Sequence, residues 1–566
     1  MSNDASTTAR KKYARLAGYL WTTALFGILC LVAAGADHRT RQVQEYAFGC
    51  DPFGYLQMAQ SVRLATVTHQ WPDFSIESEH TRLLIDMAKS RALPVSAWGE
   101  LVAPHCHHYL PASNLIGVQY PPGTGLMMAP FPEGQALHAL DRLVIIIMLV
   151  VGLTAMLIAA RRQAWLAAGL VVLALSLGLE MLARISDASY SINAVFAPLS
   201  LCALCLVAGF AFTSGSRRSF SFATSFVFLA GLFFGFAILV RLQITFLLFG
   251  MLVLLGPARL RLWYRSAWLP FLFGIFIGGV LPTAVHQSRL AGAWYLPTYG
   301  IGNTDPPLLS AIRPNLHFYF GPGKASQFLW GLLLVLVGFV AIAFRCRNAD
   351  TEAPTERIFP LNWRRVGLSA LIMWLAPTIY FLTHEVTGHH YPIPTIFATG
   401  LLLSLGAVAL ENSGTGVSPV NFPQRHRWAR WSALVLALLP VVGSLWLIQT
   451  PIVLSNEETT ARVFRVPPEL TDQRAWIWSD ELSGSFWYYA QKPAHKVIFS
   501  NPDTRALVYK FVNDRQEPQY FIDDGPDMTK MKEEMINLGA QFERRGIVDG
   551  RTYYLVRWPA EGPIKN

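Results

Sequence analysis

LVIIIMLVVGLTAMLIAA, residues 143–160, is an uncharged apolar run that ends at Arg161-Arg162. A run of about 20 apolar residues is long enough to cross a bilayer as a helix. Basic residues next to such a helix are enriched on the cytoplasmic side of the membrane. Similar runs recur along the chain, with short basic clusters between them. Of the 566 residues, 52% are hydrophobic and 14% are charged, whereas soluble domains carry about a quarter charged residues. The sequence therefore predicts a polytopic α-helical membrane protein.

Apolar length and the placement of basic clusters predict about eleven membrane-spanning helices. The block 222–257 is too long for one span and lies between two basic clusters, so an even number of crossings makes it a hairpin. Arg241 is the only charge in that block and is expected at the outer turn. The predicted spans are 16–35, 143–160, 164–182, 192–212, two within 222–257, 267–285, 327–344, 366–382, 392–410 and 431–450.

The basic N-terminus is predicted to lie on the cytoplasmic side of an inner (plasma) membrane. An odd number of crossings then places the tail on the outer side. We divide the chain into a membrane domain, 1–453, whose first outer loop is 36–142, and an extracytoplasmic domain, 454–566. The tail is predicted to be a small α/β domain because strand and helix patterns alternate in it. The expected strands are 475–478, 496–499 and 552–556, and the expected helix is 528–538.

The first outer loop contains Gly49-Cys50-Asp51-Pro52-Phe53-Gly54-Tyr55. Asp-Pro is typical of a helix start, since Asp caps free amide groups and Pro fits the first helical position. The run 55–63 is then expected to form a short amphipathic helix on the membrane. Asp51 has two interpretations: a helix cap, or a carboxylate fixed where it can act on a substrate that arrives through the lipid.

Arg241 also has two interpretations. A charge within an apolar block is costly unless it is paired or reaches water, so its side chain could snorkel to the outer headgroups. Alternatively, its guanidinium could clamp a phosphate through paired hydrogen bonds, as arginine commonly does.

Histidine and cysteine patterns leave the metal and disulfide questions open. The outer histidines, in 105–108 and 384–390, lack HExxH or CxxC spacing, so no metal site is predicted. A divalent cation that Asp51 shares with a phosphate stays an alternative. Cys50 and Cys106 are both placed outside, where a disulfide between them would tie the loop down beside Asp51.

Several function classes are disfavoured. The net charge of +10 falls in clusters between spans, which is a membrane-topology pattern and indicates no nucleic-acid partner. The inner side has no Gly-rich phosphate loop, and no span carries the ladder of acids and bases that a proton pump needs. A lipid or small-molecule transporter or flippase, and a non-catalytic subunit of an envelope glycan assembly complex, remain alternatives to an enzyme.

Five motifs together resemble the GT-C class of membrane glycosyltransferases, and in particular its protein O-mannosyltransferase and lipid A aminoarabinose transferase group. The match extends over most of residues 10–500, and the Tyr-Pro-Pro-Gly stretch is its most specific part. The motifs are Asp51-x-x-x-Tyr55, Tyr120-Pro121-Pro122-Gly123, Ile238-Leu239-Val240-Arg241, His390-Tyr391-Pro392-Ile393-Pro394 and Ser483-Gly484-Ser485-Phe486-Trp487-Tyr488-Tyr489.

The resemblance implies an inverting transfer of a sugar from a polyprenyl-phosphate donor to an envelope glycan, lipid or protein on the outer face, with Asp51 as base. No cofactor is implied with certainty. Many relatives have a second acid after the first and Arg-Tyr in the late loop, where this chain has Pro52 and His390. The substrate-binding residues expected on this basis are Tyr55, Tyr120, Arg241, Lys324, His390 and Tyr391.

Overall fold

The structure is a computed structural model of the whole chain. It describes residues 2–43, 45–47, 49–105, 107–162, 165–185, 190–211, 217–256, 267–298, 309–320, 363–384, 392–410, 430–440, 464–496 and 500–559.

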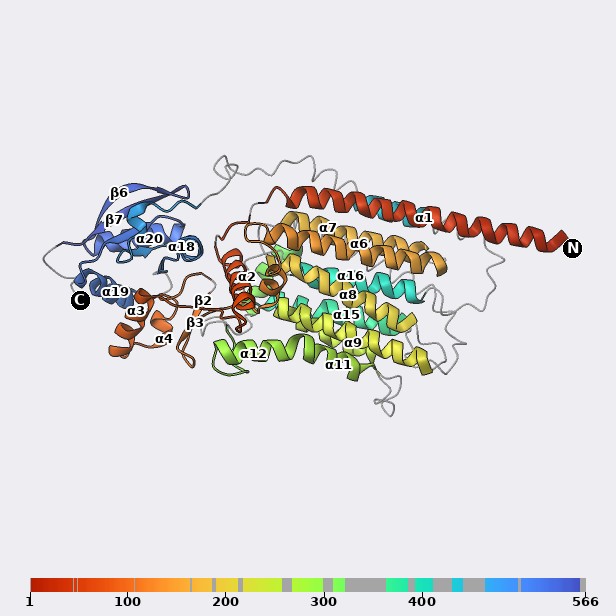
Figure 1. Cartoon of the computed structure of the whole chain (residues 1–566), viewed down its shortest axis with the longest axis horizontal. Coiled ribbons are helices and arrows are strands. Elements are labelled where there is room, and N and C mark those ends of the chain that lie inside the picture. The colour runs from red at the N-terminus through yellow and green to blue at the C-terminus, as the bar shows by residue number, and fades with distance from the viewer. Residues whose placement is uncertain are drawn as a thin grey trace.

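Long helices lie side by side in a bundle, and the N-terminus and the C-terminal sheet are at opposite ends of the molecule (Figure 1). The first outer loop lies at the same end as the C-terminal sheet. The bundle contains α1 (Ser2–Thr40), α6 (Ala136–Arg162), α7 (Trp165–Ile185), α8 (Tyr190–Ala211), α9 (Arg217–Val240), η1 (Leu242–Leu247), α10 (Leu248–Leu255), α11 (Trp268–Ile275), η3 (Phe276–Val280), α12 (Leu281–Leu290), α15 (Trp363–Thr383) and α16 (Ile393–Leu410). The short helices η4 (Leu309–Ala311) and α13 (Ile312–Phe320) precede α15.

Within the described part of the chain, seven helices have the length and apolar composition of a membrane span, and three shorter apolar helices accompany them. The polytopic helical fold predicted from the sequence is thereby confirmed. The block 222–257 is divided at Arg241 into α9 and the η1–α10 segment. The predicted span 327–344 and the second half of 431–450 lie outside the described residues, so the count of eleven stays a prediction.

Glycines allow α9 and α11 to pack backbone against backbone. A Cβ atom added to Gly231 would lie 2.0 Å from the carbonyl oxygen of Phe271, and one added to Gly274 would lie 2.3 Å from that of Phe228. Small residues at such crossings let membrane helices approach closely, and van der Waals contact then holds them together. This contact fixes α9, whose last residue, Val240, precedes Arg241.

Gly231→Ala is therefore expected to destabilise the bundle by about 1–3 kcal/mol, the usual cost of overpacking a close contact. Thermal unfolding in detergent measures the effect. Gly27→Ala in α1 is the matched control, because an added Cβ there would meet no atom within 4 Å. Equal melting temperatures for the two variants would contradict the close packing of α9 on α11.

The first outer loop and the tail share a hydrophobic core. The loop consists of α2 (Asp51–Thr68), β1 (Ser75–Ile76), α3 (Glu79–Ser90), α4 (Val95–Trp98), β2 (His107–Leu110), β3 (Leu115–Val118) and α5 (Gly123–Met128). Leu84 and Trp98 of the loop are buried in the same cluster as Trp478 and Phe521 of the tail. The two regions, separated in sequence by the bundle helices α6 to α16, therefore pack as one unit.

The tail contains helix α20 (Pro526–Asn537) and a four-stranded mixed sheet. The strand order is β4 (Trp476–Trp478), β5 (Gln519–Ile522), β7 (Arg551–Arg557) and β6 (Gln541–Val548), and only β4 and β5 are parallel. The predicted strands at 475–478 and 552–556 and the helix at 528–538 correspond to β4, β7 and α20, while 497–499 and the boundary at 453/454 lie outside the described residues. The other elements of the tail are η7 (Pro468–Thr471), α18 (Ser483–Ala490) and α19 (Pro502–Asp514).

A buried histidine at this shared core predicts acid sensitivity. His80 stacks on Trp476 with ring centroids 4.1 Å apart, and burial, followed by the charge of Lys492, lowers the His80 pKa from 6.5 to about 4. Because the folded-state pKa lies below the unfolded value, this stability is present above pH 6.5 and is lost as the pH falls toward 4. The loss is up to roughly 3 kcal/mol.

Thermal unfolding followed by tryptophan fluorescence between pH 7 and pH 4 tests this expectation. His80→Phe keeps an aromatic ring against Trp476 and cannot take up a proton, so its melting temperature should fall less over that range. The pH dependence of the melting temperature should become smaller in His80→Phe but should not disappear, since burial also lowers the pKa of His107 and His495. An unchanged slope in His80→Phe would assign the acid sensitivity to other groups.

Candidate functional site

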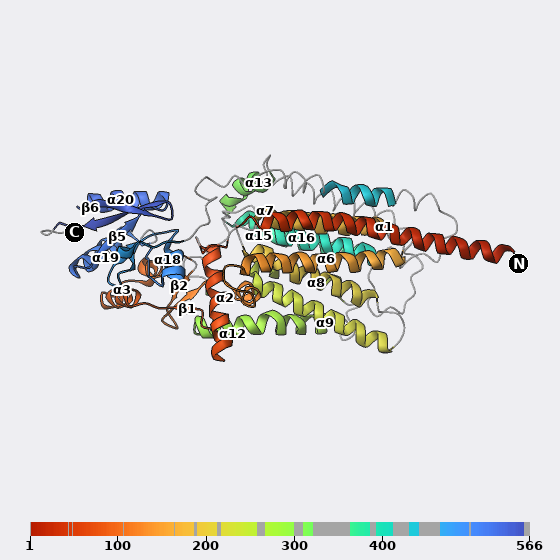
Figure 2. The same cartoon turned by 45° about the horizontal axis from the view of Figure 1, so that its top comes forward.

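Asp51 is the first residue of α2, and Pro52 follows it within the first turn. The cap position belongs to Cys50, whose side chain makes no capping hydrogen bond, so the interpretation of Asp51 as the cap is wrong. A carboxylate in the first turn is favoured by the helix dipole. The predicted surface helix 55–63 is part of α2, which lies across the direction of the bundle helices (Figure 2) and is largely buried in its first half.

Two tyrosines from the predicted site meet at Asp51. The Tyr120 hydroxyl donates a hydrogen bond to Oδ1 of Asp51, and its ring stacks on Tyr55 with centroids 4.7 Å apart. Tyr55 is 2% exposed and Tyr120 is 9% exposed. The structure thus brings together Asp51, Tyr55 and Tyr120, which come from two motifs far apart in the loop.

The glycines after Tyr120 pack α5 between α2 and the end of α9. A Cβ atom on Gly123 would lie 2.5 Å from the amide nitrogen of Val240, and one on Gly125 would lie 2.5 Å from Cβ of Met58. Neither neighbour is the end of a flexible side chain, so both positions require glycine. The Tyr-Pro-Pro-Gly stretch therefore contacts Asp51 at its first residue and the backbone next to Arg241 at its last.

Arg241 connects α9 to η1 in an extended conformation, with φ −151° and ψ 111°. Its side chain is buried, with 6% of the residue exposed, and Nη1 donates to Oγ of Ser191 in α8 over 3.1 Å. The turn expected at Arg241 is present, between α9 and η1. An arginine that snorkels would reach the headgroups, so the snorkelling interpretation is wrong for this buried side chain. The guanidinium instead lies inside the protein, adjacent to the segment that α5 contacts.

The start of the late outer loop is held near the residues that follow Arg241. The ring of Tyr380 in α15 packs at a tilt against Phe246 of η1, with centroids 4.6 Å apart, and stacks on His384, with centroids 4.1 Å apart. Nδ2 of the buried Asn315 donates to the carbonyl oxygens of Phe381, Leu382 and His384. Lys324, His390 and Tyr391, the other predicted binding residues, lie outside the described residues.

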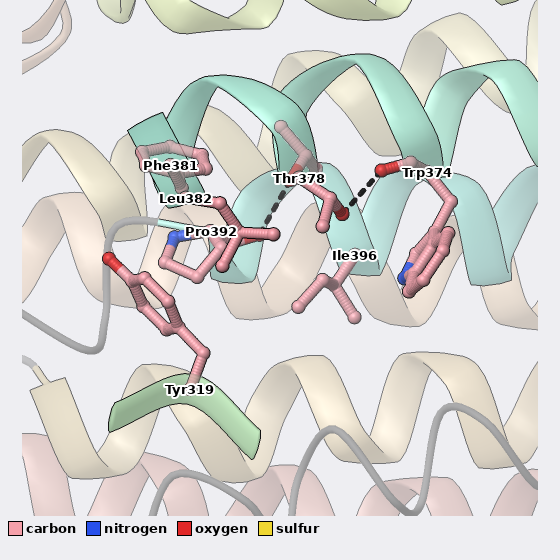
Figure 3. Close-up of a pocket in the computed structure, with 8 residues that line it drawn as sticks. Tyr319, Trp374, Thr378, Phe381, Leu382, Pro392 and Ile396 are labelled. Carbon is pink, nitrogen blue, oxygen red and sulfur yellow. Dashed lines mark hydrogen bonds between the residues drawn. The ribbon is translucent and has the colours of Figure 1, made fainter. Parts of the chain in front are cut away.

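A small apolar pocket lies between α13, α15 and α16 (Figure 3). The hydroxyls of Thr378 and Thr395 donate to the carbonyls of Trp374 and Pro392, so they satisfy their own helices rather than a ligand. Such a lining suits a hydrocarbon better than a sugar. The lining residues are Tyr319, Trp374, Thr378, Phe381, Leu382, Pro392, Thr395 and Ile396.

A polar network that sequence reasoning missed extends from Cys50 to Glu100. Nε2 of Gln119 donates to Cys50 Sγ, and the His108 ring lies between Gln119 Oε1, at 2.6 Å, and Glu100 Oε1, at 2.5 Å. Burial is the largest single influence and would raise the Glu100 pKa, but the hydrogen bond and charge of His108, together with the charges of Lys496 and His105, hold that pKa below its ordinary value. Cys50 is disulfide-bonded, while Cys106, its expected partner, lies outside the described residues.

Two further polar residues near the site were missed. Asp141 of α6 is fully buried, and Oδ1 accepts a 3.1 Å hydrogen bond from Nδ2 of Asn193, two residues after Ser191 in α8. The available signal was an acid at the start of an apolar run, where a buried charge needs a partner. In the part of the chain that the structure describes, no group of three or more His, Cys, Asp or Glu residues could hold a metal ion.

Among solved structures, the chain is similar to ArnT from Cupriavidus metallidurans bound to undecaprenyl phosphate, with 13% identity, a TM-score of 0.48, and coverage of 94% of this chain and 98% of that chain. It is also similar to the Archaeoglobus fulgidus oligosaccharyltransferase tethered with an acceptor peptide, with 10% identity, a TM-score of 0.38, and coverage of 94% and 74%. No family model and no curated protein matches the sequence. Both similarities are too distant to assign a role to any residue of this chain.

Proposed function

We propose that this protein is an inverting glycosyltransferase that moves a sugar from a polyprenyl-phosphate donor to an envelope acceptor on the outer face of the membrane. One observation carries the proposal. The Tyr120–Gly123 stretch contacts the Asp51 carboxylate at one end and the Val240 backbone, beside the buried Arg241, at the other. A carboxylate and a guanidinium in one assembly are the two charges that such a transfer uses.

Each charge has a distinct task in the proposed reaction. Asp51 takes the proton from the acceptor hydroxyl as the hydroxyl oxygen attacks the anomeric carbon. The bond from that carbon to the phosphate oxygen breaks through an oxocarbenium-like transition state. The leaving lipid phosphate gains negative charge, which Arg241 stabilises by charge-assisted hydrogen bonds. Tyr120 holds the carboxylate through its hydroxyl, and Tyr55 holds Tyr120 by stacking.

The lipid part of the donor has a matching surface. The pocket between α13, α15 and α16 is apolar, and Phe381 and Leu382, which line it, directly follow Tyr380, whose ring packs against Phe246 of η1. We propose that the first isoprenyl units enter this pocket while the phosphate reaches Arg241. Lys324, His390 and Tyr391 remain proposed donor ligands, and a divalent cation at Asp51 remains an alternative way to bind the phosphate.

A labelled polyprenyl-phosphate sugar, incubated with the protein in nanodiscs, tests the proposal. A transferase releases free lipid phosphate and passes the label to an acceptor fraction of the envelope. A flippase moves the intact lipid across the bilayer, and a non-catalytic subunit does neither. Release of lipid phosphate that depends on added acceptor is the expected result, and movement of the intact lipid alone would replace the proposal.

The proposal also requires the site to face outward. A periplasm-active reporter fused to the C-terminus is expected to be active, because the tail and the first outer loop share one core at the end of the bundle away from the N-terminus. A chain truncated after Arg162 is the control and should expose the reporter to the cytoplasm. Activity only from a cytoplasm-dependent reporter at the full-length C-terminus would contradict a site on the outer face of the membrane.

A further inference from the structure

The segment just before Asp51 is held by α18 of the tail. The backbone N–H of Ala47 donates to the Tyr489 hydroxyl over 2.9 Å, and the Ala47 carbonyl accepts from Ser485 Oγ over 2.6 Å. The N–H of Gly49 donates to the carbonyl of Glu481 over 3.2 Å. These contacts hold the backbone N–H and carbonyl of Ala47 and the backbone N–H of Gly49, and both residues lie within four positions of Asp51.

A close contact on the other side of Asp51 adds to this hold. Gly484 lies against Phe53, and a Cβ atom at residue 484 would be 2.6 Å from Cγ and Cδ1 of the phenyl ring. Phe53 is 1% exposed and also packs against the His107 ring, with centroids 5.0 Å apart. The ring therefore has little room to move away. The first turn of α2 is consequently fitted against the first turn of α18.

The position of α18 is itself fixed within the tail. Asp524 is fully buried, and its carboxylate accepts hydrogen bonds from Ser479 Oγ and from the N–H groups of Asp480 and Leu482, just before α18. Asp480 in turn contacts His105 of the first loop, with Nε2 to Oδ1 at 2.9 Å. A helix anchored in this way can transmit a fixed geometry to the residues it touches.

We propose that α18 positions Asp51 for the transfer, with Gly484, Ser485 and Tyr489 as positioning residues. This inference rests on the proposed function, because it concerns the same carboxylate. None of the three residues takes part in the chemistry. They set where the first turn of α2 begins, and a displacement of about 1 Å at a reacting group can cost a hundredfold in rate. The tail is thus a component of the active site rather than an appended domain.

Gly484→Ala tests the inference, and Gly525→Ala is the matched control in the same part of the tail, where an added Cβ would meet nothing within 4 Å. In the assay with labelled donor, Gly484→Ala should lower kcat ten- to a hundredfold and leave KM for the lipid donor within about twofold. Gly525→Ala should match the wild type. Adding Phe53→Leu to Gly484→Ala, which makes room for the new methyl group, should restore part of kcat.

Two measurements separate this inference from the proposed function. In an Asp51→Asn background, Gly484→Ala should cause no further loss, since it acts through Asp51. Hydrogen exchange over residues 45–58 should become faster in Gly484→Ala and stay unchanged in Gly525→Ala, whether or not turnover is observed. Failure of the wild type to release lipid phosphate would refute the proposed function alone. Unchanged exchange, or full kcat in Gly484→Ala beside an active wild type, would overturn the positioning role of α18.

Discussion

Asp51→Asn is expected to lower turnover by about 10²–10⁴-fold, the usual contribution of a general base, while the protein stays folded. The amide oxygen can still accept the hydrogen bond from Tyr120, and the size of the side chain is nearly unchanged. What is lost is the ability to take a proton from the acceptor hydroxyl. The measurement is release of lipid phosphate from labelled donor in nanodiscs, with thermal unfolding recorded on the same sample.

Asp86→Asn is the control for Asp51→Asn, because Asp86 is an exposed acid in α3 of the same loop. It should turn over donor like the wild type. Tyr120→Phe, which retains the stacked ring and loses the hydroxyl, should cost less than Asp51→Asn, about tenfold for one charged hydrogen bond. Full turnover by a folded Asp51→Asn protein would falsify the assignment of Asp51 as base.

Arg241→Lys is expected to weaken use of the lipid donor roughly ten- to a hundredfold, which corresponds to about 1.5–3 kcal/mol. An ammonium group cannot reproduce the paired contact of a guanidinium with phosphate. Because Arg241 is buried and does not reach the headgroups, a lysine at this position cannot replace it simply by placing a charge at the membrane surface. Donor-dependent turnover measures the change, and the loss should appear mainly in KM for the donor.

A structural role for Arg241 predicts a different pattern. Its Nη1 donates to Ser191, so Ser191→Ala removes a protein partner and leaves the guanidinium in place. Under the phosphate-clamp interpretation, Ser191→Ala has a small effect and Arg241→Lys a large one, with similar melting temperatures. Equal losses of stability and turnover in the two variants would make Arg241 a structural link between α8 and α9.

The sequence predicted the helical bundle well because apolar length and basic clusters act locally along the chain. It also selected Asp51, Tyr55, Tyr120 and Arg241, the first three of which the structure brings into contact. It could not show that Arg241 is buried. An arginine within an apolar block can reach water or remain inside, and only the packing of α5 and α8 around it decides between the two.

The tail was harder to interpret. Three of its elements were predicted from alternation, but the role of α18 depends on contacts with residues about 440 positions earlier, such as Ser485 with Ala47. Gly484 has no local signature that distinguishes it from Gly525, because the difference lies in Phe53, far away in sequence. Likewise, His108 gives no sign from its own neighbourhood that Glu100 and Gln119 will enclose its ring.

The core shared by the first loop and the tail has a consequence for biosynthesis. The backbone N–H of Ala47 donates to Tyr489, a residue 442 positions later, so the loop completes its packing only after the end of the chain has been synthesised. A nascent or prematurely terminated chain would contain its membrane-spanning helices but would lack the tail contacts that hold the segment before Asp51. Under the proposed function, catalytic competence would then begin only with a finished polypeptide, and incomplete copies would be inactive.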